Sequence, residues 1–217
     1  MIRSLRSTSP RLQRGMLCAA VLLAAVPAWG QSTNDVLLVE EHWELRLGQP
    51  DADRSAPQTT MVMSPTGNLD GVHFLLTLNH AAVPDFEAGG VQMQAWDGGE
   101  LLGYDNDDEV GSLNYSEEVL TWTQKMWLHD GSLKFRVIDG HSETWNNFGN
   151  EDMLLSVPTS LTRLNSYLPA VSLTESQVNF AENRVISLTL TKLRWMTSDG
   201  IVHEQNAPIP LDTSLDQ

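Results

Sequence analysis

Apolar and polar residues alternate along the segment VLLVEEHWELRL, residues 36–47. Its odd positions are apolar except at Glu41. From residue 40 onward its even positions are polar, namely Glu40, His42, Glu44 and Arg46. Because successive side chains of a β-strand point to opposite faces, a period of two predicts a strand with one buried face and one solvated face.

The same alternation recurs in four later segments, at residues 91–96, 118–128, 132–138 and 184–196. Turns rich in Asp and Gly separate many of these segments, and they predict hairpin tips at Asp130-Gly131 and Asp199-Gly200. Residues 72–80 are apolar on both faces over much of their length, which indicates a central strand.

Many short strands with frequent turn residues are typical of an all-β fold. We therefore predict one antiparallel β-sandwich of jelly-roll type over residues 35–205, with flexible ends at 31–34 and 206–217. Leucines recur at helical spacing only in residues 159–168. That segment fits either a short helix or an irregular crossing.

The first 30 residues have the features of a secretory signal peptide. Four arginines and no acidic residue precede the apolar run MLCAAVLLAAVPAWG, which ends in the small residues Ala28 and Gly30. The apolar core is about 14 residues long, short of the roughly 20 that span a bilayer. We predict cleavage after Gly30 and export to the periplasm, the cell surface or the medium.

Cleavage would leave a strongly acidic chain. Nine Lys and Arg residues would remain against 28 Asp and Glu, a net charge of −19 compared with −15 for the full sequence. Such a charge disfavours nucleic acids and anionic membranes as partners. The single cysteine, Cys18, would leave with the leader, so the exported domain would be held together by its core without disulfides.

Glu41 is the one carboxylate on a mostly apolar strand face. A glycoside hydrolase uses such an acid, with a raised pKa, together with a second carboxylate on the same cleft wall. The sequence offers no second strand carboxylate of this kind. The structural alternative, which we favour, places Glu41 near a sheet edge or in an ion pair with Arg or Lys.

None of the six histidines has the spacing of a metal site, which needs several ligands brought close together. The segment YDNDDEVG, residues 104–111, carries oxygen ligands of the kind calcium binds, at Asp105, Asp107 and Glu109. The glycine that bends a calcium loop at its sixth position is out of place here. An ordinary acidic loop is therefore the alternative to a calcium site.

Aromatic and amide side chains share strand faces in two segments. VQMQAW places Gln92, Gln94 and Trp96 on one face, and LTWTQKM places Trp122 and Gln124 together. Flat rings among amides suit a sugar, whose C–H face stacks on tryptophan while amides pair with its hydroxyls. If Trp122 belongs to the core, only the first three residues remain as a candidate surface. In HSETWNNFG, residues 141–149, Trp145 and Phe148 either fill the core or form a binding tip.

The blocks EEHWELRLGQPD, APQTTMVMSP and TWNNFG resemble segments of an uncharacterised group of exported bacterial β-rich proteins that share such blocks across most of the mature chain. The resemblance implies export and a single domain. It implies no activity, and no catalytic residue is carried over from it.

We expect an exported, non-catalytic β-sandwich that recognises carbohydrate at the cell envelope or outside the cell. Two alternatives stay open. One is a secreted polysaccharide-degrading enzyme that uses Glu41 with an unidentified second acid. The other is a structural subunit that forms a homo-oligomer by strand addition at an exposed sheet edge.

Overall fold

The structure is a computed structural model that describes residues 34–49, 57–79, 90–107, 113, 115–149 and 153–211. The predicted signal peptide, residues 1–30, lies outside the described residues. Among the residues that are described, no helix is long and apolar enough to cross a bilayer.

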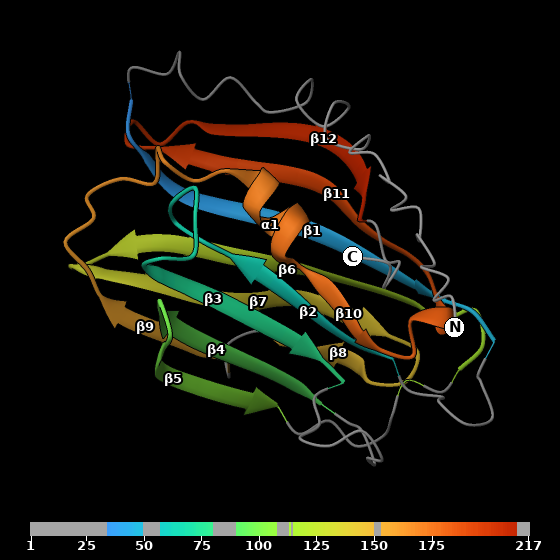
Figure 1. Cartoon of the computed structure of the whole chain (residues 1–217). Coiled ribbons are helices and arrows are strands. Elements are labelled where there is room, and N and C mark those ends of the chain that lie inside the picture. Colours follow the sequence, from blue (N-terminus) through green and yellow to red (C-terminus); the bar gives the residue numbers. More distant parts are fainter. Residues whose placement is uncertain are drawn as a thin grey trace, which may run out of the picture.

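Two antiparallel sheets form the fold (Figure 1). Sheet A has the order β12-β11-β1-β6-β7-β8, and β9 also pairs with β7. Its strands are β1 (Val36–Leu47), β6 (Val119–His129), β7 (Ser132–Ser142), β8 (Asn146–Phe148), β9 (Leu154–Pro158), β11 (Val185–Thr197) and β12 (Val202–Pro210). Sheet B has the order β10-β2-β3-β4-β5. Its strands are β2 (Gln58–Met63), β3 (Val72–Leu78), β4 (Val91–Asp97), β5 (Glu100–Asp107) and β10 (Gln177–Phe180).

The core lies between the inner faces of the two sheets. Phe74 of sheet B stacks on Phe135 of sheet A, with 4.8 Å between ring centroids. Trp43 and Trp122, on the neighbouring strands β1 and β6, stack at 6.4 Å. All four rings are buried. The predicted all-β antiparallel sandwich is therefore confirmed.

The alternation in residues 36–47 places the side chains of β1 as the sequence predicts. Val39, Trp43 and Leu45 point inward and are buried, whereas His42 and Glu44 lie on the outer face and are only partly buried. β1 pairs with β11 on one side and with β6 on the other, so it is a central strand of sheet A. The hairpin tips predicted at Asp130-Gly131 and Asp199-Gly200 are also confirmed.

Among the described residues there is one α-helix, α1, which spans Pro169–Glu175 and lies beside β1 and β2 (Figure 1). Residues 159–168 are not helical; they form an irregular crossing with a turn at 165–166. The helix begins directly after this crossing. Proline is favoured in the first turn of a helix because its missing N–H would have no partner there. A one-turn 3₁₀ helix follows at Glu182–Arg184.

The C-terminal strand is longer than the sequence predicts. β12 continues to Pro210, and Leu211 is buried in the core, so the flexible tail predicted from residue 206 begins too early. β12 is an edge strand, where proline is tolerated. Its prolines, Pro208 and Pro210, argued against a strand in the sequence, and for that reason the strand was not predicted to extend this far. In residues 141–149 the core alternative holds: Trp145 and Phe148 are buried and meet edge to face, 5.5 Å between centroids.

Candidate functional site

Gln92, Gln94 and Trp96 lie side by side on the outer face of β4. Each is partly buried. The indole Nε1 of Trp96 donates to Oε1 of Gln94 at 3.1 Å, and Nε2 of Gln94 donates to Oε1 of Gln92 at 2.8 Å. These hydrogen bonds fix the side chains in one arrangement, so binding a ligand would cost little additional ordering.

The neighbouring strand β5 extends this surface. Tyr104 is opposite Gln94, and Asn106 is opposite Gln92, so both point to the same outer face. Nε2 of Gln92 donates to Oδ1 of Asn106 at 3.0 Å, and the Tyr104 ring is 62% exposed. We call these five residues the aromatic–amide strip. It contains two rings and three amides, and it has no charged group.

The other two predicted binding residues do not join the strip. Trp122 and Gln124 lie on the inner face of β6 and are buried, at 2% and 0% exposure. The core alternative for Trp122 therefore holds. The amide nitrogen and oxygen of Gln124 have no hydrogen-bond partner among the described residues, but both face the interior and cannot meet a ligand on the surface of sheet B.

Glu41 is fully buried on the inner face of β1, opposite Gln124. Its carboxyl group accepts three hydrogen bonds: from Trp43 Nε1 at 3.0 Å, from the Tyr167 hydroxyl at 2.5 Å and from the Ser172 hydroxyl at 2.5 Å. The expectation of a sheet edge or an ion pair is wrong. β1 is central, and within the described part of the chain Glu41 has no Arg or Lys partner.

Burial raises the pKa of Glu41 above the ordinary glutamate value. Hydrogen bonds from Ser172, Tyr167 and Trp43 oppose this rise but only in part. A raised pKa is typical of a hydrolase acid. Such an acid must also lie in a cleft that a sugar can enter, and Glu41 is covered by the crossing segment and α1. This placement argues against Glu41 as the acid of a polysaccharide-degrading enzyme.

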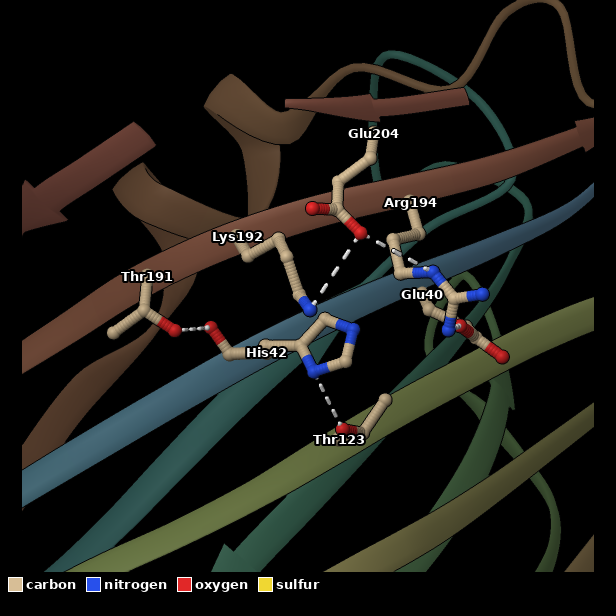
Figure 2. Close-up of polar contacts among 7 residues, drawn as sticks. All are labelled: Glu40, His42, Thr123, Thr191, Lys192, Arg194 and Glu204. Carbon is tan, nitrogen blue, oxygen red and sulfur yellow. Dashed lines mark hydrogen bonds and ion pairs between the residues drawn. The ribbon is translucent and has the colours of Figure 1, made fainter. Parts of the chain in front are cut away.

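The outer face of sheet A carries a row of charges across five strands. In register, the row runs from Glu204 through Arg194, Glu40 and Lys125 to Arg136. Figure 2 shows part of it: Arg194 Nη1 lies 2.8 Å from Glu40, and Glu204 lies 3.7 Å from both Arg194 and Lys192. Lys125 reaches Glu40 at 3.2 Å. Because two cations cover it, Glu40 is only 6% exposed although it lies on the outer face.

The neighbouring row of outward side chains, two residues further along β1, contains His42 between Lys192 and Thr123 (Figure 2). Its Nδ1 is 2.9 Å from the Thr123 hydroxyl, while its Nε2 is buried without a partner in the described chain. Burial and the charge of Lys192 lower the pKa of His42, so its neutral form is favoured.

A groove of about 310 Å³ opens beside His42 on this face. Hydroxyl, carboxylate, ammonium and imidazole groups line it, from His42, Glu44, Thr121, Thr123, Asp139, Thr191 and Lys192. Its volume suits a small polar ligand. Sequence reasoning missed this groove, because its residues come from four strands whose pairing the sequence does not specify.

The predicted calcium residues are only partly described. Asp105 belongs to β5, and one of its carboxylate oxygens accepts a hydrogen bond from the backbone N–H of Leu154 at 3.2 Å. The side chain of Asp107 and all of Glu109 lie outside the described residues, so a calcium site stays a prediction. Across the ranges that are described, no three His, Cys, Asp or Glu side chains are placed to hold a metal ion.

Sequence reasoning also missed Tyr104 and Asn106. The signal was present, because Tyr104 and Asn106 alternate with Asp105 in a period of two. The acidic composition of residues 104–111 favoured a loop instead. β5 in fact runs as far as Asp107.

Comparisons with known proteins give little further information. No family model and no curated protein matches the chain. Among solved structures, the chain is similar to SCP-B, a member of the eqolisin family of peptidases in a complex with the tripeptide Ala-Ile-His. The identity is 12%, the match covers 80% of this chain and 81% of SCP-B, and the TM-score is 0.30. At that score the similarity carries no inference about activity.

Proposed function

We propose that this protein is an exported, non-catalytic module that binds a neutral carbohydrate on the aromatic–amide strip of sheet B. One observation carries the proposal: the β4–β5 register brings Trp96 and Tyr104 to one face with Gln92, Gln94 and Asn106. Export rests on the leader-like features of residues 1–30.

The chemistry of the strip matches that of a sugar. A pyranose ring has an apolar C–H face, which stacks on indole or phenol rings, and a rim of hydroxyls that both donate and accept hydrogen bonds. Side-chain amides also donate and accept, so they pair with hydroxyls in either sense. A strip without charged groups favours a neutral sugar over an acidic one.

The surface around the strip is open. Tyr104 and Asn106 are exposed, and Leu101, the cross-strand partner of Trp96 on β5, is 43% exposed. An open sheet face admits an internal stretch of a polysaccharide chain, whereas a closed pocket admits only a chain end or a small molecule. We therefore expect oligosaccharides to bind more tightly than monosaccharides.

A glycan array on the exported chain, followed by calorimetric titration of the best ligand, tests the proposal. Trp96→Ala should weaken binding at least about tenfold, because it removes the stacking surface. Trp96→Phe should retain most of the affinity. Tyr115→Ala is the matched control, since the Tyr115 ring is 57% exposed and lies outside the strands that carry the strip.

Equal affinities for Trp96→Ala and the wild type would place the carbohydrate elsewhere on the molecule. Absence of any retained glycan on the array would refute carbohydrate binding itself. Melting curves of each variant separate a loss of binding from a loss of folding.

A further inference from the structure

The outer face of sheet A concentrates positive charge on an acidic chain. Of the nine Lys and Arg residues beyond residue 30, six point outward from this sheet. They are Arg46, Lys125, Lys134, Arg136, Lys192 and Arg194. Four acidic residues share the face, namely Glu40, Glu44, Asp139 and Glu204. The face is therefore net positive, although the exported chain as a whole would carry −19.

Only some of these cations contact a carboxylate of the described chain. Arg194 and Lys125 contact Glu40, Lys192 contacts Glu204, and Arg46 contacts Glu44 at 2.6 Å. Lys134 and Arg136 make no ion pair within the described residues, and Nε of Arg136 is buried without a hydrogen-bond partner there. Because no carboxylate pairs with Arg136 in the described chain, the outer nitrogens of its guanidinium stay available to an external anion.

Trp127 lies among these cations. Nζ of Lys125 is 5.8 Å and Cζ of Arg136 is 5.9 Å from the centroid of its ring, and Lys134 is its cross-strand partner. We call Lys125, Trp127, Lys134 and Arg136 the basic–tryptophan patch. It combines an indole ring with two cationic groups that lie within 5.9 Å of the ring centroid.

We propose that the basic–tryptophan patch binds an acidic polysaccharide, whose negative groups are carboxylates or sulfate esters. Arg136 pairs with the acidic group, because a planar guanidinium binds carboxylate or sulfate through two parallel hydrogen bonds. Trp127 stacks on the sugar ring that carries that group. This site is separate from the aromatic–amide strip and lies on the opposite sheet.

The groove beside His42 extends the site along β6. Thr123 and Thr121 line the groove, and they precede Trp127 on the same strand face by four and six residues. At about 3.3 Å per residue, the distance from Trp127 to Thr121 is roughly 20 Å. The exposed Thr121 hydroxyl can pair with a sugar hydroxyl there, so we expect binding to strengthen with oligosaccharide length.

The overall negative charge does not prevent this association. At physiological ionic strength the Debye length is about 8 Å, so carboxylates on the far sheet are screened from a ligand on sheet A. Two acidic residues are nearest to the patch in sequence: Asp130, which lies at the tip of the β6–β7 hairpin and contacts His129 at 3.1 Å, and Asp139, which lines the groove.

Calorimetric titration at 0.15 M salt tests the proposal with four ligands: oligogalacturonate, its carboxyl-reduced neutral counterpart, dextran sulfate and vesicles of anionic lipid. The exported chain should bind oligogalacturonate or dextran sulfate, and the stronger of the two identifies the acidic group. Arg136→Gln should weaken that binding about tenfold or more. Arg163→Gln removes the same charge at an exposed position that contacts Asp35, so it should change the affinity less than twofold.

Trp127→Ala should also weaken binding, and Trp127→Phe should restore most of it if the ring acts by stacking. Trp96→Ala should leave it unchanged, which separates this site from the proposed carbohydrate site on sheet B. Three results would overturn the proposal: binding of the carboxyl-reduced sugar that Arg136→Gln and Trp127→Ala weaken as much as they weaken binding of the acidic sugar, equal losses for Arg136→Gln and Arg163→Gln, or binding to the vesicles alone.

Discussion

At the scale of single residues, Glu41 shows how a buried carboxyl group is accommodated without a cation. Trp43, Tyr167 and Ser172 together satisfy both of its oxygens. The sequence identifies Glu41 as anomalous because it breaks the alternation of β1. It does not identify Tyr167 and Ser172, which are 126 and 131 residues away, because alternation carries no information about contacts between distant segments.

The raised pKa of Glu41 makes stability depend on pH. The stabilisation is fully present below the unfolded-state pKa and is lost as the pH rises through the higher folded-state pKa. Glu41→Gln cannot ionise, and its amide can still pair with Trp43, Tyr167 and Ser172. In urea unfolding from about pH 4 to 8, the free energy of unfolding of the variant should rise relative to that of the wild type. The gain should be up to about 1.4 kcal/mol per pH unit between the unfolded-state and the folded-state pKa. Parallel stability curves would contradict the raised pKa.

At the scale of elements, alternation predicts the strands well because each one buries a single face. It leaves their pairing open, and β1 pairs with β6 and β11, which are distant in the sequence. The helix α1 was missed because seven residues are too few to establish a helical period, although proline after Leu168 signalled a possible start. Because alternation does not specify which strands pair, the aromatic–amide strip could be predicted within β4 but not across to β5.

The pairing of β7 with β8 gives a prediction at this scale. A Cβ at Gly140 would meet the backbone oxygen of Phe148 and lie 2.6 Å from its Cδ2 atom. Gly140→Ala should therefore destabilise the fold by about 2 kcal/mol, because β8 must shift to relieve overpacking. Gly103→Ala in β5 is the control: its Cβ meets nothing within 4 Å, and it should cost less than about 0.5 kcal/mol. Chemical denaturation measures both, and equal midpoints would contradict the tight β7–β8 contact.

At the scale of the whole molecule, the sandwich separates two kinds of outer face. Sheet B presents uncharged rings and amides, whereas sheet A presents most of the positive charge of the exported chain. Composition predicts the net acidity. It does not predict this separation, because the gathering of cations on one face depends on the register of five strands.

Carbohydrate binding on sheet B is the central claim, and the indole N–H resonances of the tryptophans test it most directly. The exported chain has six, in Trp43, Trp96, Trp122, Trp127, Trp145 and Trp195, and Trp96→Phe assigns the resonance of interest. During titration with a neutral oligosaccharide, we predict that the Trp96 resonance shifts in a saturable way while those of the buried Trp43 and Trp122 stay in place. Saturable binding that leaves the Trp96 resonance unmoved would contradict the account.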